Sequence, residues 1–408
     1  MGYSKQVIKG FSWSAVLSAS AMAVSLGKVV ILSHFIFGPA EFGIFGIGVL
    51  VLGILELITE TGINVFLVQE TEPLTTYLDT AWVTSILRGI LISVLVALLS
   101  YPIAVFFKIS TNWMFILSFA LLPLLRGFIN PAITNLQKNL KFREDSLYRF
   151  SVSVVEDLSI IILAVLTHSI YSFIIGMFIG VFFEVAVTFI FVKERPHFRF
   201  EGEHFKKIVN RGKWVTLALI FDYLFEHTDD LVVGRILNVF SLGIYQNSYA
   251  LAVLPEKLVG QQLGKVTFPV FVNFIDDKKR LRRAFFRVLF STLAIVTPFT
   301  LALFFLSEPV IRVALGSKWL AAIPVLRILA LFALVRAVAN LFYPLFLAFK
   351  RQNYITTSTL VSMVVLIVLV FPLTNQFGIA GAAAAALLGS VVAIPVEFYY
   401  LHILTRAK

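Results

Sequence analysis

The stretch from Arg211 to Tyr245, RGKWVTLALIFDYLFEHTDDLVVGRILNVFSLGIY, is apolar enough to cross a membrane, yet it contains four acidic residues. They follow one another at i, i+4, i+7 and i+8, a spacing that puts them on one face of an α-helix. The four are Asp222, Glu226, Asp229 and Asp230. Acids inside a bilayer are costly and usually face a water-filled cavity or a partner. The stretch therefore predicts a membrane-spanning helix with a functional face.

The whole chain has the composition of an all-α, polytopic membrane protein. Of its 408 residues, 59% are hydrophobic and 14% are charged, and its mean hydropathy is +0.92. A soluble domain is about half apolar and about a quarter charged, and the alternation that a membrane β-barrel needs is absent. The lack of cysteine excludes disulfides and thiolate metal sites. We expect no metal, no cofactor and no nucleic-acid partner, since basic cytoplasmic loops account for the net charge of +11.

Apolar runs of about 20 residues predict about twelve spanning helices. The first begins near the N-terminus and continues to Phe37, too long for a cleaved signal peptide. The predicted spans are 10–37, 43–68, 79–103, 113–135, 148–168, 170–192, 214–237, 243–271, 286–306, 322–347, 354–374 and 379–403.

Lysine and arginine predict the orientation of these helices. With twelve spans, 23 of the 34 basic residues fall on the side of the N-terminus and three on the other side. Because basic loops stay in the cytoplasm, we expect both termini to be cytoplasmic. The basic runs at Lys206–Lys207 and Lys278–Arg283 either only set this topology or also bind anionic membrane lipids.

The second half of the sequence repeats features of the first. Lys9-Gly10-Phe11-Ser12-Trp13 matches Arg211-Gly212-Lys213-Trp214, and Arg126 with Asn130 matches Arg336 with Asn340. Six helices separate the partners, so the two halves run in the same orientation. We therefore predict two parallel six-helix repeats, at 1–200 and 201–408. Transporters built from such repeats place the substrate path between the halves.

Three stretches carry a resemblance to a known family: LSHFIFGPAEFGIFGIGVL at 32–50, the region 211–288 with DDLVVGRILNVFSLGIYQNSYALAVLP, and LSEPVIRVALGSKWLAAIPVLRILAL at 306–331. They resemble the polysaccharide transporter branch of the multidrug/oligosaccharidyl-lipid/polysaccharide exporter superfamily. The resemblance implies two six-helix lobes around a central cavity. It implies alternating access and the flipping or export of a lipid-linked oligosaccharide across the cytoplasmic membrane of a prokaryote. It also implies that the protein works beside glycosyltransferases and a polysaccharide polymerase. Many members have fourteen helices, so twelve argue against a close relation to lipid II flippases.

Cations within the predicted spans suit a cargo that carries a diphosphate, because a guanidinium donates paired hydrogen bonds to phosphate. Arg235 and Arg327 lie near helix ends and are expected to reach the interface. For the remaining cations, pairing with buried acids is the alternative to cargo contact. With the two repeated asparagines, the candidate substrate-binding residues are Lys28, Arg88, Arg126, Asn130, Lys257, Lys265, Arg336 and Asn340.

Polar residues spaced four apart predict cavity-facing stripes or static helix contacts. One such stripe combines Glu56, Glu60 and Asn64. For coupling to H⁺ or Na⁺ we select Glu56 and Glu60 together with the acids of 211–245, because a poorly solvated carboxylate can take up and release an ion. The alternative is that those acids pair with Lys257, Lys265 or Arg235.

Three other functions compete with flipping. A multidrug exporter prefers acidic, aromatic pockets, whereas this chain has cations inside its spans. A membrane enzyme commonly needs a large outer loop with catalytic residues, and here the predicted outer loops are short, so we expect no enzyme. A non-transporting scaffold has no need of buried charges.

Overall fold

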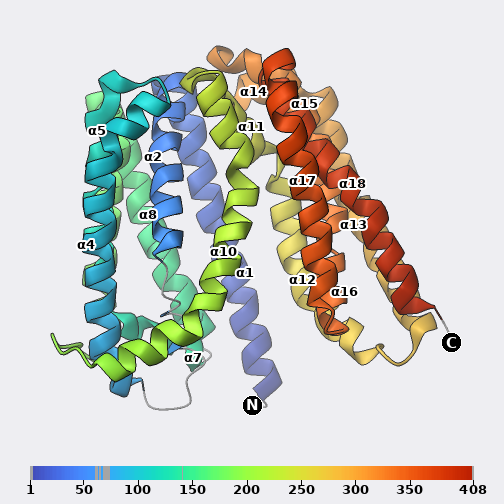
Figure 1. Cartoon of the computed structure of the whole chain (residues 1–408), viewed down its shortest axis with the longest axis horizontal. Coiled ribbons are helices and arrows are strands. Elements are labelled where there is room, and N and C mark those ends of the chain that lie inside the picture. Colours follow the sequence, from blue (N-terminus) through green and yellow to red (C-terminus); the bar gives the residue numbers. More distant parts are fainter. Residues whose placement is uncertain (1–2, 60–62, 64–65, 68–73, 140, 407–408) are drawn as a thin grey trace. The chain divides into compact units, whose positions relative to one another are not determined.

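The computed structural model describes residues 3–59, 63, 66–67, 74–139 and 141–406. Side chains are described for these residues outside 3–12, 14–15, 208–222, 224–225 and 258–266. Within the described part of the chain, every regular element is a helix (Figure 1). The chain divides into two compact units, unit 1 at Met1–Glu226 and unit 2 at His227–Lys408.

Unit 1 contains the first six spans. They are α1 (Tyr3–Ile31) with the π-helical turn Leu32–Ile36, α2 (Pro39–Ile58), α4 (Thr75–Phe106), a broken fourth span, α8 (Phe142–Thr167) and α9 (Tyr171–Phe191). The fourth span consists of the 3₁₀ turn Ser110–Asn112, α5 (Trp113–Ser118), α6 (Leu121–Gly127), the 3₁₀ turn Pro131–Thr134 and α7 (Asn135–Lys138).

Unit 2 begins within the long helix α10 (Gly202–Ile236), which carries the four acids. The rest of the unit consists of α11 (Val239–Ala252), α12 (Leu254–Asn273), α13 (Lys278–Phe305), α14 (Ser307–Ala314), the 3₁₀ turn Ser317–Ala322, α15 (Ile323–Ala339), α16 (Phe342–Ala348), α17 (Gln352–Phe377) and α18 (Ile379–Thr405).

Helices lie at all twelve predicted positions. In the described residues, nine are long and apolar enough to span a membrane by themselves, and the bent fourth span makes a tenth. The remaining two, α10 and the pair α11–α12, are less apolar because they carry the charged residues that the sequence pattern singled out. The predicted all-α membrane fold is confirmed, whereas the division into lobes at residue 200 and the central cavity stay predictions.

Prolines break two of the spans that were predicted as single helices. The fourth bends by 68° between Gly127 and Pro131. Asn130 before Pro131 has extended backbone angles (φ −72°, ψ 112°), because the proline ring disfavours the helical region for the preceding residue. Val253 ends α11, and Pro255 lies in the first turn of α12. The predicted helix 243–271 is therefore two helices.

The repeated Arg-x3-Asn motif ends a helix in both halves. Arg126 lies in the last turn of α6, and Arg336 lies in the last turn of α15. Asn130 then starts a 3₁₀ turn, and Asn340 caps the C-terminus of α15. Each motif thus places an arginine beside a break in its span.

Candidate substrate site

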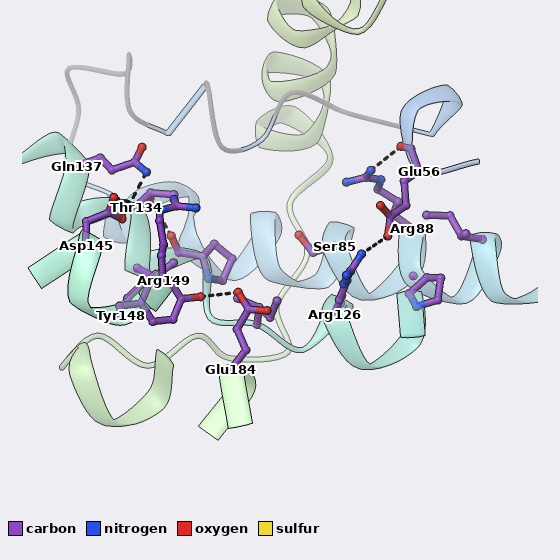
Figure 2. Close-up of a pocket in the computed structure, with 17 residues that line it drawn as sticks. Glu56, Ser85, Arg88, Arg126, Thr134, Gln137, Asp145, Tyr148, Arg149 and Glu184 are labelled. Carbon is purple, nitrogen blue, oxygen red and sulfur yellow. Dashed lines mark hydrogen bonds and ion pairs between the residues drawn. The ribbon is translucent and has the colours of Figure 1, made fainter. Parts of the chain in front are cut away.

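A cavity of about 500 Å³ lies within unit 1 (Figure 2). Its walls come from α2, α4, α8 and α9 and from the broken fourth span. Two of the proposed substrate-binding residues and one of the proposed coupling residues line it together. The cavity is lined by Glu56, Ser85, Arg88, Gly89, Ile92, Pro123, Arg126, Gly127, Ile129, Pro131, Ile133, Thr134, Gln137, Asp145, Tyr148, Arg149 and Glu184.

Two arginines meet the last turn of α2 on one side of this cavity. Arg126 Nη1 donates to Glu56 Oε1 over 2.7 Å. Arg88 Nη2 donates to the carbonyl oxygen of Glu56 over 2.6 Å, and its Nε donates to Thr59 Oγ1 over 3.3 Å. The carbonyls of a final helical turn lack their usual partners and carry a partial negative charge. The end of α2 therefore attracts both guanidinium groups, each of which Figure 2 joins to Glu56 by a dashed line.

The opposite wall of the cavity carries two carboxylates, Asp145 and Glu184, and the phenol of Tyr148. Tyr148 donates from its hydroxyl to Glu184 Oε1 over 2.6 Å. Asp145 accepts from Arg149 Nε over 3.1 Å and from Gln137 Nε2 over 3.4 Å. The cavity thus combines three arginines, which suit phosphate oxygens, with three carboxylates, a phenol and an amide, which suit sugar hydroxyls.

The fourth span carries three polar residues spaced four apart, Arg126, Asn130 and Thr134, and the break in the span separates them. Arg126 and Thr134 both line the cavity. Asn130 between them is fully buried. Its Nδ2 donates to the carbonyl of Glu194 over 2.9 Å, and its Oδ1 accepts from Ala132 N over 3.0 Å. These bonds hold the turn that follows α6.

Lys28 lies apart from the cavity lining, on α1. Its Nζ is 2.5 Å from Asp157 Oδ1 on α8, and Ser25 Oγ donates to the other oxygen of Asp157 over 2.5 Å. Asp157 is only 3% exposed. This geometry matches the alternative of a helix-to-helix ion pair.

The candidate substrate residues of unit 2 contact their own unit. Arg336 Nη1 donates to Tyr249 OH over 2.5 Å. Asn340 Nδ2 donates to Glu256 Oε1 over 2.6 Å, and the neighbouring Lys257 is exposed. The side chain of Lys265 lies outside the described residues, as do Glu60 and Asn64.

The acids of α10 have partners of their own. Asp229 accepts from the hydroxyl of Tyr245 and, over 3.0 Å, from the backbone N–H of Asp230. Asp230 Oδ2 is 2.9 Å from His227 Nδ1. Both aspartates are buried, whereas Glu226 is exposed. The side chain of Asp222 lies outside the described part of the chain.

Sequence reasoning missed the residues that α8 and α9 contribute to the cavity. Asp145, Tyr148 and Arg149 are spaced i, i+3 and i+4, so the first two turns of α8 offered a recognisable polar face. Glu184 stands alone in the apolar helix α9, which is itself a signal of function or pairing. No cluster of three or more metal-ligating side chains occurs among the residues that the structure describes.

Apolar spanning helices around a charged internal cavity define a polytopic membrane transport protein. The chain belongs to the family described as "Polysaccharide biosynthesis protein", whose pattern matches residues 31–324.

Individual relatives agree with this assignment. The chain is 25% identical to the lipopolysaccharide biosynthesis protein WzxC of Escherichia coli K12, over 86% of this chain and 72% of that protein. It is 24% identical to an uncharacterized membrane protein in the cps region of Klebsiella pneumoniae, over 98% of this chain and 83% of that protein. The fold is that of the lipid II flippase MurJ in an inward closed conformation, with a TM-score of 0.77, 16% identity and coverage of 95% and 87%.

Proposed function

We propose that this protein flips or exports a polyprenyl-diphosphate-linked oligosaccharide across the cytoplasmic membrane for cell-surface polysaccharide biosynthesis. The observation that carries the proposal is the unit 1 cavity, in which Arg88 and Arg126 converge on the end of α2. The family assignment and the fold likeness to a lipid II flippase support it.

The cargo explains why the cavity is charged although the helices around it are apolar. A diphosphate moved through hydrocarbon without partners costs tens of kcal/mol by Born estimates, and each bare hydroxyl costs several. Arginine offsets the phosphate charge through paired hydrogen bonds. Tyr148, Glu184 and Gln137 supply donors and acceptors for sugar hydroxyls. Transport breaks no covalent bond, so the site needs positioning groups and no nucleophile.

Movement of the cargo is expected to follow alternating access, driven by H⁺ or Na⁺. The buried Asp229 and Asp230 on α10 are the proposed coupling residues, together with Asp222, Glu226 and the acids Glu56 and Glu60. The remaining candidate contacts for the cargo are Asn130, Lys257, Lys265, Arg336 and Asn340. Lys28, a further candidate from the sequence, instead pairs with Asp157.

The basic loops support an orientation with both termini in the cytoplasm. The cargo is assembled on membrane lipid, so glycosyltransferases that build it and a polymerase that extends it are the proposed neighbours.

Flipping in sealed proteoliposomes tests the proposal. Purified protein is reconstituted with a fluorescent polyprenyl-diphosphate oligosaccharide, and an added quencher reports how much of the probe lies in the outer leaflet. Protein-dependent equilibration between leaflets is the expected result.

The same vesicles test the second candidate, a multidrug exporter, which the three carboxylates and the tyrosine of the cavity favour. Efflux of a cationic dye, with no movement of any lipid-linked sugar, would reject the flippase in favour of the exporter.

A further inference from the structure

A carboxyl group lies buried between α17 and α18, in unit 2. Glu397 on α18 is 6% exposed. Its Oε1 accepts a hydrogen bond of 2.6 Å from Ser358 Oγ on α17. Its Oε2 is also buried and has no hydrogen-bond partner among the described residues. Glu397 is not among the residues proposed above for cargo contact or ion coupling.

The helix pair around Glu397 is otherwise packed for close contact. Both helices bury one residue in every four along the line where they meet, a contact that we call the α17–α18 seam. On α18 the buried line is Gly381, Ala385, Gly389, Ala393, Glu397 and Leu401. On α17 it is Ser358, Ser362, Leu366, Val370 and Thr374.

The backbones approach closely at the glycines of this seam. A Cβ on Gly389 would lie 2.9 Å from the carbonyl oxygen of Ser362, and one on Gly381 would lie 1.9 Å from that of Leu373. Small residues allow such packing in membranes. Glu397 is the exception on a line of glycine, alanine and leucine, so packing alone does not explain a carboxyl group there.

No positive charge on the surrounding helices compensates Glu397 in the described structure. On α18 itself the other titratable groups are Tyr399 and His402, which are exposed, and Tyr400, which stacks on Tyr354 of α17 at 4.0 Å. Tyr354 is the sole titratable residue of α17.

Four further helices, α11, α13, α15 and α16, contact α18, and their titratable groups are engaged elsewhere or exposed. On α16 the titratable residue is Tyr343, which is exposed. On α15, Arg336 donates to Tyr249 of α11, and Arg327 donates to Ser307 Oγ over 2.8 Å. On α11, the other tyrosine, Tyr245, donates to Asp229. On α13, Lys278 donates to a backbone carbonyl and lies over Phe349, and the five other basic residues are exposed at its start: Lys279, Arg280, Arg282, Arg283 and Arg287.

The protonation state follows from this geometry. A buried carboxylate without a cation and with one bare oxygen carries a desolvation penalty of several kcal/mol. The neutral acid leaves only an unpaired polar group, which costs about 1–3 kcal/mol. Glu397 is therefore a carboxylic acid while the seam is closed, and it gains from ionisation once water reaches it.

A proline lies next to the acid. Pro395 is inside α18, two residues before Glu397. Proline has no N–H, so the carbonyl one turn earlier loses its helical partner and the helix bends more readily there. Glu397 lies eight residues before Thr405, the last residue of α18, which is about 12 Å along the helix axis. Bending at Pro395 would open a short path to water.

We propose that Glu397 is a proton site of unit 2, which binds H⁺ when the α17–α18 seam closes and releases it when the seam opens at Pro395. Ser358 is a positioning residue, because its hydroxyl stabilises the ionised form. This proposal rests on the proposed function for its link to cargo movement, whereas the proton site itself can be tested without cargo.

An apolar carbodiimide tests the proton site directly, since such reagents modify protonated carboxyl groups in apolar surroundings. The full-length protein in lipid nanodiscs is treated with dicyclohexylcarbodiimide between about pH 5 and pH 9, and adducts are located by peptide mass spectrometry. We expect modification of Glu397 to fall at least about tenfold as the pH rises. Glu308 on α14 is the matched control, because it is exposed and paired with Arg312 at 2.9 Å. It should react weakly throughout. Absence of an adduct at Glu397, or an adduct yield that does not change with pH, would overturn the proposal.

Two substitutions separate a proton site from a packing residue. Glu397→Gln keeps the size of the neutral acid, so we expect an unchanged melting temperature and a flattened pH profile of proton-driven flipping. Ser358→Ala removes the donor to the ionised form, so carbodiimide modification should persist to higher pH. An unchanged pH profile in Glu397→Gln would overturn the link to transport. Flipping without modification of Glu397 would reject the proton site alone, whereas pH-dependent modification without movement of any lipid-linked sugar would reject the flippase alone.

Discussion

Arg126 on α6 and Glu56 on α2 form an ion pair of 2.7 Å, although 70 residues separate them in the sequence. The two side chains remain 35% and 29% exposed, respectively. The guanidinium is thus held by an internal carboxylate while it still faces the cavity. An anionic cargo that binds Arg126 would therefore have to compete with Glu56.

Neutralising this competitor should tighten binding of the cargo. In Glu56→Gln the amide oxygen still accepts a hydrogen bond, but the charge that opposes a diphosphate is gone. We expect a half-saturating concentration of polyprenyl-diphosphate oligosaccharide about fivefold lower, corresponding to about 1 kcal/mol. Concentration-dependent flipping measures it, and Glu308→Gln on α14 serves as the control. Weaker binding in Glu56→Gln would show that Glu56 itself contacts the cargo.

Lys28 is expected to contribute to stability more than to transport. Lys28→Met leaves Asp157 buried without its cation, which costs about 3–5 kcal/mol for a buried pair. The melting temperature should therefore fall clearly in the single mutant and recover in Lys28→Met/Asp157→Leu, in which both charges are removed. If Lys28→Met abolishes flipping at an unchanged melting temperature, the lysine contacts cargo instead.

The acids of α10 should control the response to an ion gradient. We expect Asp222→Asn/Asp229→Asn/Asp230→Asn to keep gradient-independent flipping and to lose its acceleration by a pH or Na⁺ gradient. Glu203→Gln, an exposed acid at the start of the same helix, should behave as wild type. Full gradient-driven flipping by a normally folded triple mutant would remove α10 from the coupling mechanism.

Substitution by alanine is expected to have opposite effects on stability at two glycines. A Cβ on Gly89 of α4 would lie 2.4 Å from the carbonyl oxygen of Pro123, in the wall of the cavity. Gly89→Ala should therefore destabilise the protein by about 1–3 kcal/mol through overpacking. Gly27 on α1 has no atom within 4 Å of such a Cβ, so Gly27→Ala should be neutral or stabilising by up to about 1 kcal/mol. Thermal unfolding of both variants measures the difference, and equal effects would contradict it.

The spans could be predicted because a bilayer demands long apolar runs, a local property of the sequence. The break at Asn130 was also local, since the conformational restriction before proline decides it. The pairing of charged side chains, in contrast, is not a local property of the sequence. Arg88, Arg126 and Glu56 were each singled out, but their meeting depends on how α2, α4 and α6 pack. The sequence does mark Glu397 as unusual, since it is the only acid in the 27 residues of α18.

The most direct test of the central claim is the flipping rate of a polyprenyl-diphosphate oligosaccharide in vesicles that contain Arg88→Gln/Arg126→Gln. Charge-assisted hydrogen bonds contribute about 1.5–3 kcal/mol each, so we predict a rate at least about a hundredfold lower, with the melting temperature showing that the variant is folded. Arg312→Gln, which removes an exposed arginine paired with Glu308 on α14, should flip at the wild-type rate. An undiminished rate in the double mutant would contradict the assignment of the unit 1 cavity as the site that holds the diphosphate.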